Sequence, residues 1–230
     1  MVSAIEDNLK RINDSMVEAA VGCGRAAEEV RLVAVTKTYS VDEIAEAVRC
    51  GVKQIGENRA QELEEKRCLW QAPPITWRFI GHLQTNKVRK AVEFASAVDS
   101  VDSVRLARAL SRAAEERGLV LPVLMEVNTS GEESKHGVHP SQAEQLVEVL
   151  LRECPGLRLD GLMTIGPLTE DEVAVRGAFA MLRTMRDKFA RSYGAPLREL
   201  SMGMSGDFGL AIKEGSTMVR IGSAIFGRRT

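Results

Sequence analysis

Short runs of apolar residues, many of them β-branched, alternate along the chain with longer segments in which apolar residues recur every three to four positions. The short runs are typical of strands buried on both faces, and the longer segments are typical of helices with one buried side. Strands are predicted over 32–37, 52–58, 76–82, 95–101, 121–127, 157–165, 200–204 and 217–226. Helices are predicted over 3–29, 40–51, 59–69, 84–94, 103–117, 140–153, 170–193 and 208–214.

Two of the predicted helices carry further local signals. Ser40, followed three positions later by Glu43, predicts a capping box at the start of the helix over 40–51. The helix over 59–69 is rich in charged residues, so it is expected to lie on the surface.

The alternation of strands and helices indicates the fold class. Eight strand–helix units over 230 residues predict an α/β protein built as a single (β/α)8 TIM barrel with an extra N-terminal helix. An open, doubly wound sheet is the alternative. The barrel is favoured because the strand count is eight and no GxGxxG motif opens the first unit. No linker or low-complexity segment divides the chain, so residues 1–230 are predicted to form one domain.

Composition and charge exclude several classes of protein. The chain has 31 basic and 32 acidic residues spread along it, which argues against a nucleic-acid partner or a membrane-binding tail. No apolar run reaches the roughly 18 residues of a membrane span. Early acidic residues argue against a secretory signal or a transit peptide. The four cysteines form no CxxC pair, which predicts a cytoplasmic protein with free, mostly buried thiols and no metal site.

The first predicted strand ends on a lysine, Lys37. A lysine at the carboxyl end of a buried strand is partly desolvated. Desolvation disfavours the charged ammonium, lowers its pKa and leaves the amine nucleophilic. Such lysines form Schiff bases with carbonyl compounds and with pyridoxal phosphate (PLP). Taken alone, the strand also allows an ordinary lysine that points into solvent.

In a barrel, the active site lies at the carboxyl ends of the strands. The residues at or next to the predicted strand ends are mostly polar: Lys37, Asn58, His82, Asp99, Ser100, Asn128, Thr129, Met163, Thr164, Ser201 and Arg220. They predict a polar ring at one rim of the barrel with a nucleophilic lysine in it.

The last two predicted strands suggest an anion site. Loops after strands seven and eight of barrels commonly bind phosphate. Gly222 lets the backbone approach an anion closely, the N–H groups of Gly222 and Ser223 can donate, and Ser201 can add a hydroxyl. A lysine across from this site calls for a ligand with an aldehyde and a phosphate, which describes both PLP and a phosphorylated sugar. Glycines that serve only turns remain an alternative.

Six segments together resemble the pyridoxal phosphate homeostasis proteins, the YggS/PROSC group. They are Val-Ala-Val-Thr-Lys at 33–37, Ile-Gly-Glu-Asn at 55–58, and the segments 79–87, 128–137, 200–207 and 219–223. The similarity runs in register over essentially the whole chain. It implies a barrel related to the N-terminal domain of alanine racemase and a role in vitamin B6 and amino-acid homeostasis, without established catalytic turnover.

The resemblance also implies residue roles. PLP would be held as an imine on Lys37, and its phosphate would contact Ser201, Gly222, Ser223 and the backbone of Arg220. The Arg220 side chain would face the ring nitrogen of the cofactor. A guanidinium donates hydrogen bonds and keeps its proton, so that nitrogen would stay unprotonated and the ring would be a weaker electron sink.

Racemases of this fold take a second acid/base from an additional β domain and a partner subunit. The sequence ends at Thr230, directly after the predicted barrel, so that domain is expected to be missing. We therefore expect a PLP carrier or regulator without catalytic residues, and not an enzyme. A small PLP-dependent racemase or decarboxylase of the same fold is one alternative, and a Schiff-base aldolase acting on a sugar phosphate is another.

Four further residues complete the predicted site. Asn58, at the end of the second strand, is grouped with the cofactor-binding residues. His82 either orients the site or only caps a strand end. Lys135 lies in the polar loop 128–137, whose length suits a lid or exchange element as well as a solvated loop. Met204 is a candidate pocket wall. The expected partners are PLP and PLP-dependent apoenzymes, and the chain is expected to be a monomer.

Overall fold

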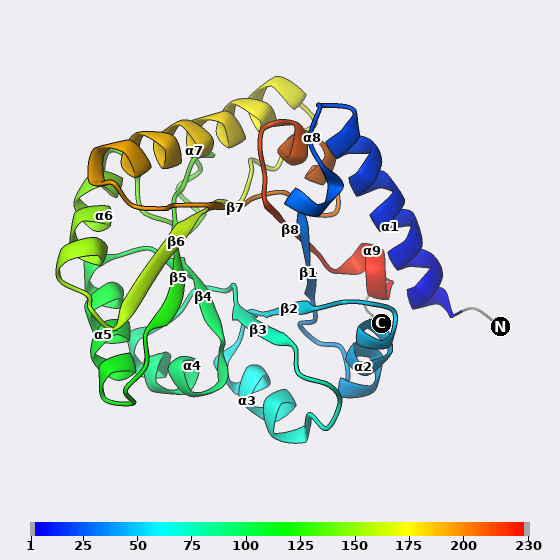
Figure 1. Cartoon of the computed structure of the whole chain (residues 1–230), viewed down its shortest axis with the longest axis horizontal. Helices are drawn as coiled ribbons and strands as arrows, with labels where there is room; N and C mark the ends of the chain where they lie inside the picture. Colours follow the sequence, from blue (N-terminus) through cyan, green and yellow to red (C-terminus); the bar gives the residue numbers. More distant parts are fainter. Residues whose placement is uncertain (1–2, 228–230) are drawn as a thin grey trace.

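Eight strands close into a parallel barrel in which each strand pairs with its neighbours in sequence, and β8 pairs with β1 (Figure 1). The structure is a computed structural model and describes residues 3–227. The strands are β1 (Arg31–Val35), β2 (Gln54–Glu57), β3 (Thr76–Phe79), β4 (Ala97–Val101), β5 (Leu121–Glu126), β6 (Leu157–Met163), β7 (Glu199–Ser201) and β8 (Met218–Ile221). The register of Arg31 with Met218 through Ala34 with Ile221 closes the ring. The predicted TIM barrel is therefore confirmed.

Helices surround the barrel, and the predicted N-terminal helix lies outside it against the last two helices (Figure 1). They are α1 (Ala4–Val21), α2 (Val41–Arg49), α3 (Ala60–Leu69), α4 (Val88–Phe94), α5 (Val104–Glu115), α6 (Ala143–Arg152), α7 (Glu172–Tyr193), α8 (Phe208–Lys213) and α9 (Ser223–Phe226), with 3-10 turns at Ala27–Glu29, Thr85–Lys87 and Pro140–Gln142. In the described part of the chain, no helix has both the length and the apolar character needed to cross a membrane.

Side-chain caps set where several helices begin. Ser40 Oγ accepts from the N–H of Glu43 at 3.3 Å, and the Glu43 carboxylate accepts from the N–H of Ser40 at 2.7 Å. The predicted capping box is confirmed. Asp171 likewise accepts from the first N–H groups of α7. These acceptors satisfy donors that helix geometry leaves unpaired.

The predicted helix over 3–29 is wrong in its second half. The helix α1 ends at Val21, and only Ala27–Glu29 returns to a helical turn. Gly24 adopts a φ of 76° between these segments, a conformation that costs side-chain-bearing residues energy. Gly22 and Gly24 interrupt the apolar periodicity in the sequence, and the helix ends where they do so.

The predicted strand over 217–226 is also too long. The strand β8 ends at Ile221, and α9 follows Gly222 directly. A Cβ at Gly222 would lie 3.2 Å from the carbonyl oxygen of Val35, so the absent side chain lets this turn pack against the end of β1. The first strand likewise ends at Val35, before the lysine. Lys37 and Ser223 therefore stand beyond the strands, at one rim.

One expectation about exposure is confirmed and one is wrong. The charged helix α3 lies on the surface, with Leu63 and Lys66 on its buried face. The thiols are free but not mostly buried, because Cys23 and Cys68 are exposed. Cys23 lies in the turn after α1 and Cys68 near the end of α3, where few neighbouring segments cover them.

A continuous apolar core joins the strands to the surrounding helices. Its largest fully buried side chains include Trp77 and Phe79 on β3, Ile44 on α2 and Phe179 on α7. Burying one such side chain stabilises the fold by roughly 1.5–3 kcal/mol. The strand ends are thus anchored in packed structure, and the loops that follow them start from fixed positions.

Candidate functional site

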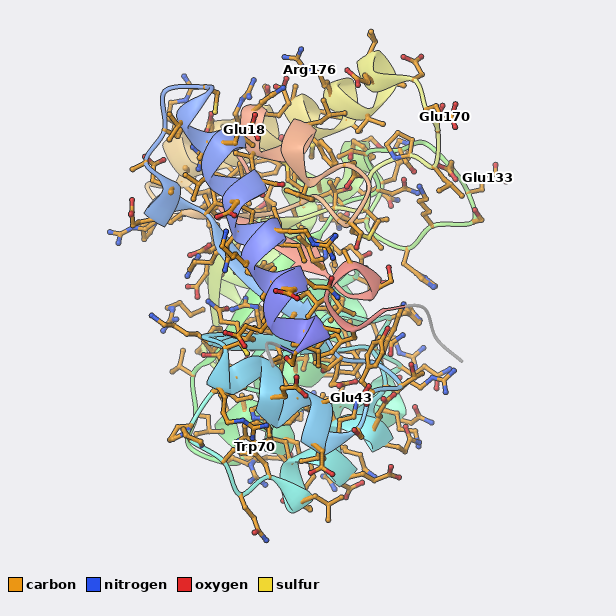
Figure 2. All side chains as sticks on the ribbon, turned by 90° about the vertical axis from the view of Figure 1, so that its right-hand side faces the viewer. Glu18, Glu43, Trp70, Glu133, Glu170 and Arg176 are labelled. Carbon is orange, nitrogen blue, oxygen red and sulfur yellow. The ribbon has the colours of Figure 1, made fainter. Side chains whose placement is uncertain are left out.

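The loops that leave the carboxyl ends of the strands form one rim of the barrel. Figure 2 shows Glu133 and Glu170, on the loops after β5 and β6, projecting from the same side of the molecule. Lys37 lies on this rim, in a turn that directly follows β1, and is half-buried. The next residue, Thr38, has a φ of 71°.

A buried ion cluster holds the residue before Lys37 in place. Lys66 Nζ, on α3, donates to the carbonyl oxygen of Thr36 at 2.6 Å and to Oε1 of both Glu57 and Glu62 at 2.7 Å. The hydroxyl of Thr36 donates to Glu57 Oε1 at 2.5 Å. Burial raises the pKa of Glu57, and the Lys66 ammonium opposes this shift. Glu57 Oε1 thus accepts two hydrogen bonds, whereas the buried Glu57 Oε2 has no partner among the described residues.

The same cluster reaches the other side of the lysine. The backbone N–H of Thr38 donates to the carboxylate of Glu62, so the peptide groups on both sides of Lys37 are tied to charged side chains from α3 and β2. Hydrogen bonds to charged groups are stronger than neutral ones. The turn therefore presents the lysine from a rigid base.

Arg220, on β8, is the buried cation of the site. Its side chain donates from Nη1 to Ser201 Oγ at 2.7 Å and from Nη2 to the carbonyl oxygen of Thr164 at 2.8 Å. Burial lowers the pKa of Arg220, while Asp99 and other acids oppose the shift. The guanidinium remains charged because arginine does not release its proton in proteins.

Glu126, the last residue of β5, is a site residue that the sequence prediction missed. It is 3% exposed, and its carboxyl group has no hydrogen-bond partner within residues 3–227. Burial and the nearby Asp102 raise the pKa of Glu126 to about 7, although Arg220 opposes this. An acidic residue that closes the apolar run Leu-Pro-Val-Leu-Met was the available sequence signal.

The turn at Gly222 supplies unused donors. The N–H groups of Ser223 and Ala224 begin α9 and find no acceptor among the described residues. Ser201 accepts from Arg220, which leaves its own hydroxyl proton available. The backbone N–H of Arg220, which the family resemblance implied as a phosphate contact, donates to the carbonyl oxygen of Gly203 at 2.9 Å.

Asn58 and His82 stand at the ends of β2 and β3. Asn58 Oδ1 is buried and has no hydrogen-bond partner among the described residues. Gly81 packs so tightly that a Cβ there would lie 2.4 Å from the Asn58 carbonyl oxygen. The His82 ring stacks on that of His136, with centroids 4.0 Å apart. His82 is therefore part of a side-chain cluster, which neither predicted role had included.

Lys135 and Met204 line a second part of the rim, a pocket of about 330 Å³ between the loops after β6 and β7. Lys135 Nζ donates to Glu132 Oε1 at 2.7 Å and to the carbonyl oxygen of Gly166 at 2.6 Å. These bonds tie the loop 128–137 to the neighbouring loop. Met204 is partly exposed at the pocket wall.

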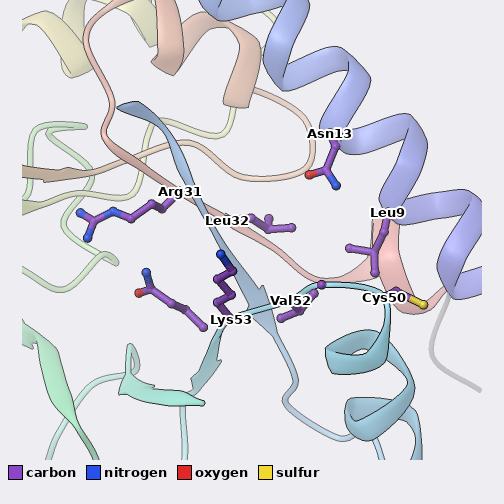
Figure 3. Close-up of a pocket in the computed structure, with 9 residues that line it drawn as sticks. Leu9, Asn13, Arg31, Leu32, Cys50, Val52 and Lys53 are labelled. Carbon is purple, nitrogen blue, oxygen red and sulfur yellow. The ribbon is translucent and has the colours of Figure 1, made fainter. Parts of the chain in front are cut away.

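Another pocket, of about 310 Å³, lies at the opposite end of the barrel (Figure 3). Leu9 and Asn13 of α1 face Arg31 at the start of β1 and Lys53 just before β2. Because barrels bind their ligands at the carboxyl ends of the strands, this pocket is not the candidate site.

The donors at the carboxyl rim fit a ligand with an aldehyde and a phosphate. The amine of Lys37 stands after β1, and the unused N–H groups of Ser223 and Ala224 follow the adjacent strand β8. A buried guanidinium lies at Arg220. PLP offers a matching group to each of these three.

Comparison with known proteins decides the family. Residues 2–230 match the model of the alanine racemase N-terminal domain. The chain is 40% identical over 223 residues to the pyridoxal phosphate homeostasis protein of Aquifex aeolicus, covering 97% of both chains. It is 44% identical to the protein of that name from Bos taurus, covering 96% of this chain and 86% of the other. The chain belongs to the pyridoxal phosphate homeostasis protein family. The resemblance found in the sequence is thus confirmed.

Solved structures of similar proteins agree with the fold. PipY of Synechococcus elongatus with PLP bound is 33% identical, with a TM-score of 0.82 over 97% of this chain and all of that chain. A protein from Bifidobacterium adolescentis is 42% identical, with a TM-score of 0.90 over 96% of this chain and 94% of the other. Alanine racemase from Streptomyces lavendulae, at 17% identity and a TM-score of 0.77, shares the fold, and the match spans 57% of that enzyme.

Proposed function

We propose that this chain binds PLP covalently on Lys37 and takes part in intracellular PLP homeostasis without catalytic turnover, as a single domain spanning residues 1–230. One observation is the main support for the proposal. Hydrogen bonds hold the turn of Lys37 after β1, and backbone N–H groups without an acceptor among the described residues follow the adjacent strand β8. The names of the relatives and the PipY structure with PLP support the choice of ligand.

Lys37 supplies the covalent bond in this proposal. Its amine attacks the aldehyde carbon of PLP, a C=N bond replaces the C=O bond, and water leaves. The ion cluster behind the turn fixes the backbone, so little conformational entropy is lost when the bond forms.

The turn at Gly222 supplies the phosphate site. The N–H groups of Gly222, Ser223 and Ala224 and the hydroxyl of Ser201 are the proposed donors. Donors to a dianion make charge-assisted hydrogen bonds, roughly twice as strong as neutral ones. Asn58, with its buried and unpaired Oδ1, is proposed to accept from a ligand group. His82, Lys135 and Met204 are proposed to line the entrance.

Arg220 favours a binding role over an enzymatic one. Its guanidinium is anchored by Ser201 and Thr164 and has further N–H donors to offer a ring nitrogen. A ring nitrogen that accepts from this cation stays unprotonated, so PLP bound here supplies weaker electron withdrawal than in enzymes that protonate it. The proposed partners are PLP and PLP-dependent apoenzymes, with the chain acting as a cytoplasmic monomer.

One spectrum and one mass measurement test the covalent site. The purified protein mixed with PLP should show a visible imine band, and borohydride should add the mass of one reduced cofactor. Lys37→Ala should show neither and should keep its fold, because a rim lysine leaves no core cavity. Lys53→Ala, at the opposite end of the barrel, is the control and should behave as wild type. Cofactor that is still trapped in Lys37→Ala would reject the assignment.

Comparing two ligands tests the phosphate site. Pyridoxal, which lacks the phosphate, should bind at least about tenfold more weakly than PLP, since several charge-assisted bonds are lost. Equal affinity would reject the site at Gly222 and Ser223 while leaving the role of Lys37 intact.

Glu126 supports a second candidate, a small amino-acid racemase or decarboxylase. A buried carboxyl with a pKa of about 7 can take or give a proton near neutral pH. Incubation with a panel of L-amino acids, followed by chiral and carbon dioxide analysis, separates the two functions. Sustained turnover that disappears in Glu126→Gln would establish the enzyme and refute the non-catalytic proposal.

A further inference from the structure

Three potential metal ligands converge at the rim from three successive strand ends. His82 follows β3, Asp102 follows β4, and His136 lies in the loop after β5. His82 Nδ1 is 3.3 Å from Asp102 Oδ2, and the two imidazole rings stack with planes 12° apart. One ligand atom from each residue lies within 4.8 Å of the other two.

The loop that carries His136 is held in shape. The N–H of Asn128 donates to the carbonyl oxygen of Val138 at 3.0 Å, and the Asn128 side chain donates to that of Lys135 at 3.2 Å. Gly137 has a φ of 111°, and a Cβ there would lie 2.6 Å from the Asn128 nitrogen. These contacts flank His136 on both sides, so its position is set by the backbone.

The other two ligands are also anchored. Ser100 Oγ donates to the carbonyl oxygen of Gly81 at 2.6 Å, which fixes the residue before His82. Asp102 precedes Ser103, the residue that caps α5, and its side chain is 15% exposed. Because the backbone is held in this way, only the side chains have to reorient when an ion binds.

We propose that His82, Asp102 and His136 bind one divalent transition-metal ion of the zinc type. Two imidazoles and a carboxylate are the donor set that zinc accepts, whereas magnesium and calcium prefer oxygen ligands alone. Zinc holds such ligands at roughly 2.0–2.2 Å, so tetrahedral neighbours lie about 3.4 Å apart. The two rings, which are stacked with planes 12° apart, must turn out of the stack so that one lone pair of each points at the ion.

The three ligands leave at least one coordination position open. Structural zinc sites use four protein ligands, and sites with three keep a place for water or another small ligand. The metal would therefore be exchangeable and could take a carboxylate or a water molecule at the barrel rim. The sequence prediction of no metal site considered only the spacing of the cysteines. It missed His82, Asp102 and His136 because they lie 20 and 34 positions apart along the chain.

Zinc titration by calorimetry tests the site in the full-length chain. The parent protein for all measurements carries Cys23→Ser and Cys68→Ser, because these two exposed thiols bind zinc themselves. One zinc ion should bind per chain. His82→Ala and His136→Ala should each weaken binding at least tenfold, since loss of even an outer-sphere partner costs roughly 10–100-fold. Asp102→Asn should also weaken it.

His139→Ala is the matched control, because the chain has three histidines and His139 lies outside the cluster. It should bind zinc as the parent does, and Lys37→Ala should too, since the site does not depend on PLP. Circular dichroism should show that every variant is folded. The proposal is overturned if zinc does not bind, if His139→Ala or Lys37→Ala loses zinc as His82→Ala does, or if magnesium binds as tightly.

Discussion

Two buried carboxylates at the barrel rim have opposite surroundings. Glu57, behind the Lys37 turn, accepts hydrogen bonds from Lys66 and Thr36. Glu126, on the other side of the barrel, has no hydrogen-bond partner among the described residues and only the longer-range attraction of Arg220. Burial raises the pKa of both groups, that of Glu126 to about 7, while the Lys66 ammonium opposes the shift at Glu57.

The different surroundings of the two carboxylates suit different roles. Glu57 helps to position the Lys37 turn, and Glu126 can take up or release a proton. Glu57 belongs to a cluster whose hydrogen bonds all help to hold the turn around Lys37. Such a cluster is rigid, and removing one member leaves an uncompensated buried charge. Glu126 has no hydrogen bond to hold one protonation state, so its charge responds to pH and to any ligand at the rim. The four predictions below test this contrast.

Removing the lysine of the cluster should have the largest effect. Lys66→Met leaves Glu57 and Glu62 without their shared cation, and the loss of one partner from a buried pair costs roughly 3–5 kcal/mol. Urea unfolding at pH 7 measures this. Lys90→Met is the control, because Lys90 pairs with Glu64 in a partly exposed bridge worth at most about 1 kcal/mol. Equal losses in the two variants would show that the cluster around Glu57 is not special.

The next effect is a pH dependence at Glu126. Because its folded pKa of about 7 lies above the usual value of 4.5, the folded state binds the proton more tightly than the unfolded state. Stability is therefore highest with the proton bound and falls as pH rises from about 4.5 through 7. Relative to Glu126→Gln, the wild type should lose roughly 2.5 kcal/mol of unfolding free energy between pH 5 and pH 8.

Urea unfolding of both chains without cofactor at the two pH values measures this difference. The titration of Glu57 is common to wild type and variant and cancels in the comparison. A constant difference across the range would mean that Glu126 keeps one charge state.

Removing the acceptor of Arg220 should have a smaller effect. Ser201→Ala takes away the hydroxyl that Arg220 Nη1 bonds at 2.7 Å, and a hydrogen bond to a charged group contributes roughly 1.5–3 kcal/mol. We expect a loss near 2 kcal/mol in urea unfolding at pH 7. Ser205→Ala, at an exposed position in the same loop, should stay within about 0.5 kcal/mol of wild type. A loss as small as that of the control would show that Arg220 is held by packing alone.

The sequence carried enough local information to place the barrel and its rim. Each strand was visible as an apolar run, and Ser40 with Glu43 marked a helix start through neighbouring positions only. Once the strand ends share a rim, Lys37 and Arg220 must lie on it, whatever the side-chain details. The positions of these residues follow from topology, and their roles remain proposals.

The contacts between segments were not predictable. Lys66 looked like one charge among many on α3, because a charged pattern does not tell which lysine meets the buried carboxylate of Glu57, 9 positions away, and the carbonyl oxygen of Thr36, 30 positions away. Glu126 appeared only as the end of a strand, since its pKa depends on how fully other elements bury it. His82 and His136 are 54 positions apart, and only the folded rim stacks their rings.

The smallest expected effect concerns Thr38, next to the lysine. Its φ of 71° places a β-branched residue in the left-handed region, which costs a residue with a side chain roughly 1–2 kcal/mol. The bond from its N–H to Glu62 holds this conformation. Thr38→Gly relieves the strain but gains chain entropy on unfolding, so it should be at least as stable as wild type and about 1 kcal/mol more stable than Thr38→Ala.

If the strained turn serves to position Lys37, Thr38→Gly should also bind PLP more weakly than wild type despite its stability, because a looser turn must be ordered when the bond to Lys37 forms. Unfolding in urea and titration with PLP, followed at the imine band, measure the two quantities on the same samples. A glycine variant that binds PLP as tightly as wild type would mean that the ion cluster alone positions the lysine, and that the strain at Thr38 has no part in it.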